Sequence, residues 1–171
     1  MKKTVTIILI SICLQGWSQK PILTTDNFTV EGSIKQSQKF SLQDLMGLSI
    51  TKIDSVIITN HLLEKKSVLK NMRGVLLKDV LGKLSIDQAD PKLLSEYYFV
   101  CIAADNYKVV FSWNEIFNNE TGRHTMIITA HDGKNGTLMN DRIALLSPYD
   151  EATGRRYVKG LQKIIVRRVS E

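Results

Sequence analysis

The sequence is poor in the residue types that metal and thiol chemistry require. Its 171 residues include two cysteines and three histidines, the latter being His61, His124 and His131. We expect Cys13 to be removed with an N-terminal segment, so Cys101 would remain alone and no intramolecular disulfide could form. Cys101 lies in an apolar run, which predicts a small buried side chain rather than a reactive thiol. His131 with Asp132 and His124 could supply three metal ligands, but the spacing matches no zinc pattern, so we predict no metal site.

Enzyme motifs are absent as well. The sequence contains no Gly-x-Ser-x-Gly elbow, no phosphate-cradling glycine loop and no Cys-x-x-Cys-His haem site. Glycoside hydrolysis needs two facing carboxylates; Asp105 and Glu115 are the nearest candidates, but Asp105 already has a role as a turn residue. The net charge of +6 at pH 7 is modest. Lysines and arginines cluster only near the C-terminus, so we expect no nucleic-acid partner.

The N-terminus has the layout of a secretory signal peptide. Lys2 and Lys3 precede an apolar run over residues 4–14 that is too short to span a bilayer. Small residues then lead to Ser18, which predicts a signal peptide over residues 1–18 with cleavage after Ser18. The protein is therefore expected to be exported, either periplasmic or secreted.

A lipid anchor on Cys13 is the alternative for this segment. Bacterial lipid-attachment signals favour a small residue before the cysteine, and here that residue is Ile12. No other run is long and apolar enough for a membrane, so we expect no membrane insertion once the signal is removed. Residues 19–171 then have the usual size of a single domain with its own core.

A β-hairpin is the clearest structural signal. The apolar runs 97–104 and 107–111 flank Asp105 and Asn106, two residues that tolerate positive φ. This pattern predicts a tight hairpin with a two-residue type I′ turn, both turn residues having positive φ. Because a tight turn fixes the register of its strands, Cys101 and Phe99 are expected on one face.

Several short helices are indicated by their first residues. A serine followed three positions later by an acidic residue predicts helices that begin at Leu42 and Trp113. Apolar residues spaced by three and four predict a helix within residues 75–84. Asp90 followed by Pro91 marks another helix start.

The remaining apolar runs predict strands. With the hairpin, they cover residues 28–34, 53–59, 97–104, 107–111, 126–130, 143–146 and 161–169. Residues 56–58 are continuously apolar, which predicts burial on both faces. Residues 61–71 are polar and weakly patterned, and 118–125 are expected to form a loop. Many strands with few short helices predict the α+β class.

Six segments together resemble one protein family, the molybdopterin-binding oxidoreductase domain of sulfite oxidases and their bacterial relatives. They are Val30-Glu31-Gly32, Phe40 to Leu45, Gly74 to Leu81, Asp105-Asn106-Tyr107, Leu145 to Pro148, and Gly154 to Lys159 followed by Ile164-Ile165-Val166. Gly74 to Leu81 is similar to the family's Gly-Val-x-Leu-x-Asp-Leu-Leu segment. The resemblance covers residues 28–169 and implies a sulfite-oxidase-like α+β fold of mixed β-sheets with a few short helices.

The departures from the family affect its catalytic residues. Catalytic members hold molybdenum through a cysteine thiolate between the first helix and the Gly-Val segment. Residues 57–74 contain no cysteine, and Asn60 and His61 stand near the expected place. Ala144 occupies the position of the family's usual arginine, with Arg142 two residues earlier. The chain is thus similar to a short, exported, single-domain branch that lacks the metal ligand, and we predict no catalytic residue.

The resemblance also implies where a ligand would bind, since a pterin cofactor is an anion. The residues expected to bind it are Asp105, Asn106, Tyr107, Arg142, Arg155, Arg156 and Lys159, with Lys163 nearby. Guanidinium groups suit such anions, although these charges could equally be solvated. We expect a non-catalytic binding or accessory module whose partner is an anionic small molecule or an exported protein, with molybdopterin as a candidate cofactor. The alternatives are a molybdenum-cofactor-dependent oxidoreductase with an atypical ligand, and a structural exported interaction domain.

Overall fold

The computed structural model describes residues 21–88 and 90–169. The predicted signal peptide, its cleavage site and Cys13 lie outside these residues. Within them, no helix combines the length and the hydropathy that a bilayer crossing requires.

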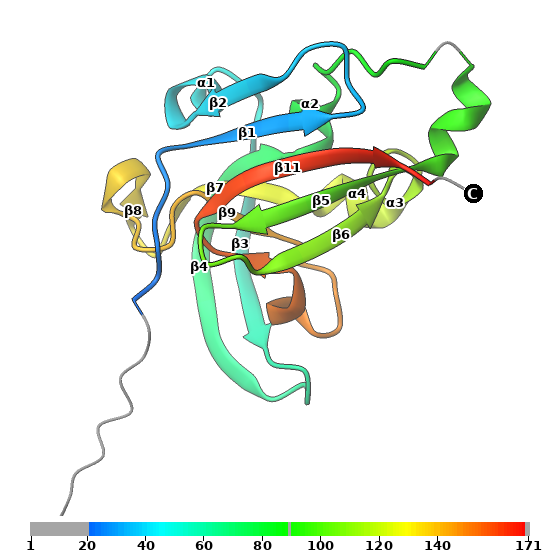
Figure 1. Cartoon of the computed structure of the whole chain (residues 1–171). Helices are drawn as coiled ribbons and strands as arrows, with labels where there is room; N and C mark the ends of the chain where they lie inside the picture. The colour runs from blue at the N-terminus through cyan, green and yellow to red at the C-terminus, as the bar shows by residue number, and fades with distance from the viewer. Residues whose placement is uncertain (1–20, 89, 170–171) are drawn as a thin grey trace, which may run out of the picture.

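A five-stranded sheet forms one layer, in the order β2-β1-β11-β5-β6. Its strands are β1 (Asn27–Gly32), β2 (Gln38–Ser41), β5 (Tyr97–Ala103), β6 (Lys108–Ser112) and β11 (Leu161–Arg168). β1 and β11 pair in parallel, with Val30 opposite Ile164, and the other neighbours are antiparallel. The first and last strands of the described chain therefore lie side by side (Figure 1).

A second sheet has the order β10-β9-β7-β4-β3, and β8 pairs with β7. Its strands are β3 (Ile50–Thr59), β4 (Lys65–Leu76), β7 (Met126–His131), β8 (Lys134–Asn135), β9 (Ala144–Leu146) and β10 (Tyr157–Val158). The long β3–β4 hairpin extends beyond the rest of the sheet (Figure 1). Mixed sheets with short helices confirm the predicted fold class.

The helices are short. They are α1 (Leu42–Met46), α2 (Leu77–Leu81), α3 (Trp113–Phe117), α4 (Glu120–His124) and the 3₁₀ helices η1 (Pro91–Glu96), η2 (Gly136–Leu138) and η3 (Thr153–Arg156). Both predicted capping boxes are confirmed. The Ser112 hydroxyl accepts from the Glu115 amide at 3.1 Å, and the Glu115 carboxylate accepts from the Ser112 amide at 2.7 Å. The pair of Ser41 and Asp44 does the same at α1.

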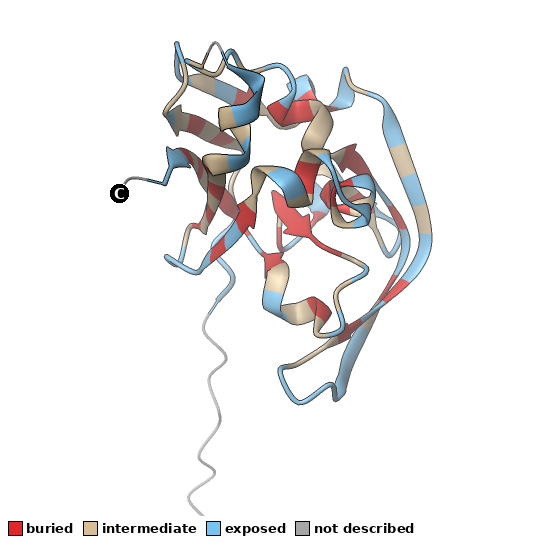
Figure 2. Ribbon diagram, turned by 90° about the vertical axis from the view of Figure 1, so that its right-hand side faces the viewer, coloured by how far each residue is buried: buried red, intermediate tan, exposed pale blue. Residues whose placement is uncertain are grey.

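The centre of the second sheet is buried on both faces. Ile127 and Leu145 belong to the cluster shared with the five-stranded sheet. Their neighbours Met126, Ile128 and Leu146 point to the opposite face, where they pack with residues of the β3–β4 hairpin. Successive side chains of a strand alternate between faces, so β7 and β9 each supply two cores. All three residues of β9 and four of the six residues of β7 are buried, and buried residues are red in Figure 2.

The predicted hairpin is present, but its turn differs from the prediction. Val109 lies opposite Cys101, whereas a two-residue turn at Asp105 and Asn106 would pair Cys101 with Val110, so the register differs by one residue. The Asn106 amide donates to the Ala103 carbonyl at 3.0 Å, so the loop comprises the three residues 104–106. Asn106 has positive φ (69°) and Asp105 does not. The two-residue type I′ prediction was therefore wrong: a turn followed by one left-handed residue also matches the strand twist.

Burial of residues 56–58 on both faces was also predicted wrongly. Val56 and Ile58 are 7% exposed, but Ile57 between them is 51% exposed. β3 is an edge strand of its sheet, and its outward face has no covering layer. The continuous apolar run of residues 56–58 therefore led to a prediction of more burial than the structure has.

Several segments differ from the prediction in their bounds or their secondary structure. β4 begins at Lys65, inside the stretch that had no clear pattern, because this arm of the hairpin is largely exposed and polar. Gly74 and Val75 belong to β4, which shortens the predicted helix to α2. A Cβ at Gly74 would lie 2.2 Å from the Ile127 carbonyl oxygen, so this glycine permits close strand packing. The predicted loop 118–125 contains α4, whose first turn is capped by Asn119.

Candidate functional site

A surface pocket of about 470 Å³ collects several of the residues that the sequence singled out. Three segments meet there: the β3–β4 hairpin, with the end of β3, the turn and the start of β4; the β5–β6 loop; and η3 with β10. Its polar lining is made by Asn60, His61, Lys66, Tyr107, Arg155 and Lys159. Residues separated by about a hundred positions in the chain thus share one site.

Tyr107 is positioned by the hairpin loop. The Asp105 carboxylate accepts from the Tyr107 amide at 3.0 Å, and the Tyr107 hydroxyl donates to the Arg155 carbonyl at 2.5 Å. The loop is thereby tied to η3. Asp105 and Asn106, predicted as ligand contacts, shape this loop and do not line the pocket.

The rim of this pocket is cationic. Arg155 and Lys159 are exposed, and neither forms an ion pair within the described part of the chain. The Lys159 ammonium lies 4.9 Å from the centre of the Tyr157 ring. Lys66 pairs with Glu64 at 2.9 Å, and both side chains are more than half exposed. Sequence patterning missed Lys66 because β4 was not recognised as a strand there.

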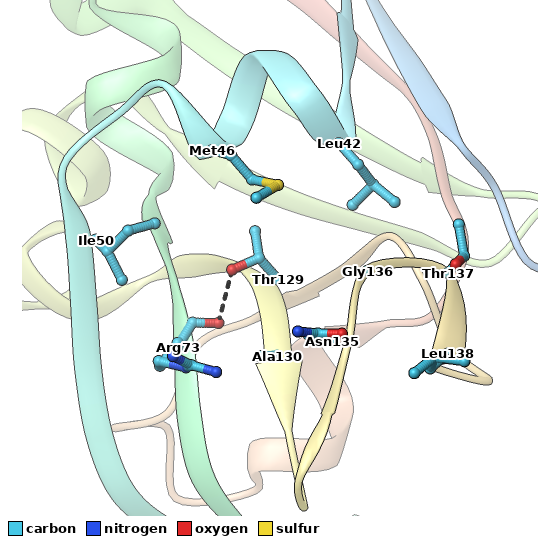
Figure 3. Close-up of a pocket in the computed structure, with 10 residues that line it drawn as sticks. All are labelled: Leu42, Met46, Ile50, Arg73, Thr129, Ala130, Asn135, Gly136, Thr137 and Leu138. Carbon is cyan, nitrogen blue, oxygen red and sulfur yellow. Dashed lines mark hydrogen bonds between the residues drawn. The ribbon is translucent and has the colours of Figure 1, made fainter.

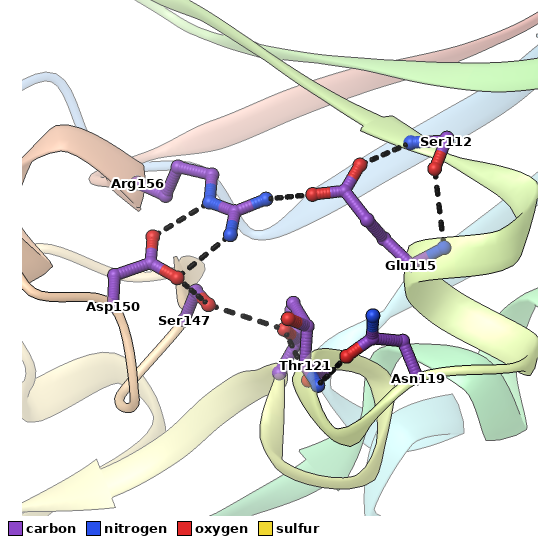
Figure 4. Close-up of polar contacts among 8 residues, drawn as sticks. Ser112, Glu115, Asn119, Thr121, Ser147, Asp150 and Arg156 are labelled. Carbon is purple, nitrogen blue, oxygen red and sulfur yellow. Dashed lines mark hydrogen bonds and ion pairs between the residues drawn. The ribbon is translucent and has the colours of Figure 1, made fainter.

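Arg156, the neighbour of Arg155, has a different environment. Its Nε and Nη2 donate to the two oxygens of Asp150 at 2.6 and 2.7 Å, and its Nη1 donates to Glu115 at 2.8 Å (Figure 4). The guanidinium also lies 4.5 Å from the centre of the Phe111 ring. Hydrogen bonding and charge attraction from Asp150 raise the pKa of Arg156. This side chain is engaged internally and is not part of the pocket lining.

Two further predicted cations lie elsewhere. Arg142 precedes β9 rather than standing on it, and its Nε donates to Asp26 at 2.8 Å. Lys163 on β11 pairs with Glu31 of β1 at 2.8 Å. The structure therefore brings together Tyr107, Arg155 and Lys159 of the predicted set and separates the others from them.

The donors near the expected metal position do not suit molybdenum. Asn60 is occupied by the β3–β4 turn: its carbonyl oxygen accepts from the amides of Leu62 and Glu64 at 2.9 and 3.0 Å, and its amide donates to the Glu64 carboxylate. His61 is exposed at the pocket and supplies only imidazole nitrogen. A molybdenum centre favours a soft thiolate, and no sulfur lines this pocket. The residues present therefore do not fit the ligand set of the catalytic family.

Cys101 cannot replace the missing ligand in this arrangement. Its side chain is fully buried on β5, as predicted, and burial raises the pKa of its thiol to about 12. At neutral pH the thiol is protonated, and the thiolate is the form that binds metals.

The histidines are not brought together. His131 lies between Asp132 and Asp141, at 2.9 and 3.0 Å, and Tyr157 donates to the other oxygen of Asp141. The hydrogen bond with Asp141 raises the pKa of His131, against the lowering effect of burial. His124 instead pairs with Glu120 on α4. Across residues 21–88 and 90–169, no group of three or more acidic, histidine or cysteine side chains is placed to hold a metal ion.

The arrangement of the sheets defines the class: a sulfite-oxidase-like molybdopterin-domain fold. Among solved structures, the chain is similar to the sulfane dehydrogenase SoxCD from Paracoccus pantotrophus, with a TM-score of 0.62 and 14% sequence identity. The match covers 88% of this chain and 41% of that one, so this chain spans less than half of its structural neighbour. No family model and no curated protein matches the sequence. At this identity the likeness establishes the fold, as the sequence resemblance implied.

Proposed function

We propose that this protein is an exported, non-catalytic binding or accessory module that uses a molybdopterin-domain fold to bind a small anion. The observation that carries the proposal is the composition of one pocket. Arg155, Lys159 and Tyr107 converge there together with Asn60 and His61, which the sequence resemblance implies stand near the position of the catalytic family's thiolate. The export part of the proposal is supported by the signal-peptide pattern of residues 1–18.

Charge and geometry favour an anionic ligand. A guanidinium presents a planar fork of donors suited to phosphate and carboxylate groups, and an ammonium adds a second positive charge. Arg155 and Lys159 have no acidic partner among the described residues. The Tyr107 hydroxyl fixes the Arg155 backbone at 2.5 Å. Binding an anion would therefore satisfy charges that the fold leaves to solvent.

The absence of a thiolate in the pocket favours binding over oxo transfer. His61 is the specific feature that keeps the alternative open, because its imidazole is exposed in the same pocket. The alternative is an oxidoreductase that holds a molybdenum cofactor through this atypical ligand. A structural interaction domain, the other alternative, would bind no small anion at all.

Metal analysis of the protein purified from its own host separates these functions. We expect no stoichiometric molybdenum, no sulfite oxidation and no sulfoxide reduction. About one molybdenum per chain, lost in a His61→Ala variant, would establish the oxidoreductase instead. If about one molybdenum per chain is found and is lost in a Cys101→Ser variant, the hairpin cysteine is the ligand. That result would contradict the inference drawn from its burial and its raised pKa.

Calorimetry with pyrophosphate tests the anion site. We expect binding that weakens as salt is raised, since exposed charges are screened over about 10 Å at 0.1 M and 3 Å at 1 M. The double variant Arg155→Gln, Lys159→Gln should bind at least about tenfold more weakly, because it removes two charged donors. Arg167→Gln is the matched control, an exposed arginine near the end of β11 that lies opposite Tyr98, at the end of β5 away from the 104–106 loop.

Equal affinity in the double variant and the control would refute the anion site. A native-state ligand must also raise the melting temperature of the parent protein. No shift with pyrophosphate, together with no heat of binding, would favour the structural interaction domain.

A further inference from the structure

A second pocket, of about 590 Å³, lies between α1 and the β7–β8 hairpin. Much of its lining is apolar, contributed by Leu42, Met46, Ile50 and Leu138. Figure 3 shows Leu42 and Met46 extending from α1 toward β7. Met46 and Leu138 are 70% and 67% exposed, which is unusual for side chains of this size that gather at one place. The volume is within the range of small-molecule sites.

One end of this pocket is polar and continues into another cavity. Arg73 and Ala130 line both the apolar pocket and a neighbouring one of about 220 Å³. The smaller pocket is also lined by Lys52, Lys134 and Asp54. The two cavities therefore adjoin at Arg73, with apolar residues on one side and charged residues on the other.

The charged end contains two like charges on neighbouring strands. Lys52 on β3 lies directly opposite Arg73 on β4, and like charges at such a cross-strand pair are destabilising. Neither side chain forms an ion pair within residues 21–88 and 90–169. Lys134 adds a third positive charge from β8. An anion placed here would offset this repulsion.

The one acidic residue at this end limits the charge of the ligand. Asp54 lines the same cavity and would repel a doubly charged headgroup more strongly than a singly charged one. A carboxylate carries one charge and matches the planar donors of an arginine.

We infer that the two cavities form one binding site for an apolar monocarboxylate. The carboxylate lies at Lys52, Arg73 and Lys134, and the hydrocarbon lies beneath α1 against Met46 and Leu138. This site is separate from the anion pocket at Arg155 and does not depend on the function proposed for it.

Calorimetry with decanoate tests the inference. We expect saturable binding, and no binding of acetate at the same concentrations, because acetate lacks the apolar tail. Arg73→Gln should weaken decanoate binding at least about tenfold through loss of a charged hydrogen-bond donor. Met46→Glu should weaken it to a similar degree by placing a negative charge on the exposed apolar rim. Arg155→Gln, at the other pocket, is the matched control and should bind as the parent does.

Three results would overturn the inference. They are unchanged decanoate affinity in both Arg73→Gln and Met46→Glu, loss of decanoate binding in Arg155→Gln, and acetate binding as tightly as decanoate. A parent that is dimeric and binds no decanoate, with a monomeric Met46→Glu variant, would instead assign the surface to a second copy of the chain. Met46 is exposed, so its variant remains informative if Arg73→Gln fails to fold. Pyrophosphate binding, measured on the same variants, reports separately on the first pocket.

Discussion

Arg155 and Arg156 are adjacent in sequence and have opposite roles in the structure. Arg155 is exposed at a pocket, and the Tyr107 hydroxyl donates to its backbone carbonyl. Arg156 makes three charged hydrogen bonds to Asp150 and Glu115 and covers the Phe111 ring. One arginine leaves its charge available to a ligand, and the other uses its charge to join η3 to α3. Neighbouring basic residues in a sequence therefore need not share a function, because the role of each side chain depends on the groups that it contacts.

The partly buried cluster of Arg156, Asp150 and Glu115 includes further hydrogen bonds besides the ion pairs. The Ser147 hydroxyl donates to Asp150 at 2.7 Å, and the Ser112 amide donates to Glu115 at 2.7 Å (Figure 4). The capping box of α3 is thus part of the same network as Arg156. By contrast, neither Arg155 nor Lys159 forms an ion pair with another residue of 21–88 or 90–169. We expect substitutions in the cluster to affect stability and substitutions at the pocket to affect binding.

The largest effect is expected for Arg156→Gln. It leaves Asp150 and Glu115 without their cation, and we expect a loss of about 2–3 kcal/mol in the free energy of unfolding. Denaturant unfolding of Arg156→Gln and Arg155→Gln side by side gives the measurement. Equal stability of the two variants would remove the distinction between the two arginines.

The next effect concerns the loop that holds Tyr107 at the pocket. Asn106 has φ of 69°, a conformation that β-branched residues resist, so Asn106→Val should cost more than about 1 kcal/mol. Asn106→Gly should be neutral or slightly stabilising, because glycine adopts this φ freely. Thermal unfolding of both variants tests this. A valine variant as stable as the parent would place the left-handed residue elsewhere in the loop.

A smaller effect is expected at Glu115, with a defined pH dependence. Burial tends to raise the pKa of this carboxyl, but hydrogen bonds from Ser112 and Arg156 outweigh it and hold the pKa below its usual value of 4.5. The stabilisation is present above about pH 4.5 and is lost as the pH falls through the lower pKa of the folded state.

Glu115→Gln should therefore cost about 0.5–1 kcal/mol at pH 7, since the pair is partly exposed, and should lose less stability on acidification than the parent. Unfolding curves between pH 7 and pH 3 give the comparison. Glu151→Gln, an exposed neighbour of the cluster, is the control. Parallel acid dependence in parent and Glu115→Gln would contradict the assigned role.

The smallest stability change is expected for Arg155→Gln combined with Lys159→Gln. Exposed residues outside hydrogen-bond networks usually change stability by less than about 0.5 kcal/mol. The same variant should bind pyrophosphate more weakly. Its affinity should therefore change while its free energy of unfolding stays nearly the same. A destabilised double variant would mean that these charges, like Arg156, belong to the structure.

Local patterns in the sequence predicted much of the fold. Both capping boxes, the hairpin strands and the burial of Cys101 follow from residues within a few positions of one another. The errors came from tertiary context: β4 is polar because it is one arm of an exposed hairpin, and Ile57 is exposed because β3 is an edge strand. The order of polar and apolar residues within a strand does not indicate whether another layer of the protein covers that strand.

The candidate site was less predictable for the same reason. Tyr107, Arg155 and Lys159 do gather at one pocket, but the signal for Arg156 was the same as for Arg155. Its partner Glu115 is 41 residues away, and only the packing of η3 against α3 brings the two together. The apolar pocket beneath α1 gave no sequence signal, because its lining comes from six separate elements: α1, β3, β4, β7, β8 and η2.

The position of β11 constrains how the protein is made. This strand is the last of the described chain to be synthesised, yet it lies at the centre of its sheet, between β1 and β5. Until it emerges, β1 with β2 and β5 with β6 can exist only as two separate ribbons, which are marginally stable in water. The sheet thus assembles after translation of its final strand, by contacts between distant parts of the chain, a pattern associated with slow folding. Under the export proposed above, such a delay would keep the chain unfolded while it is being translocated.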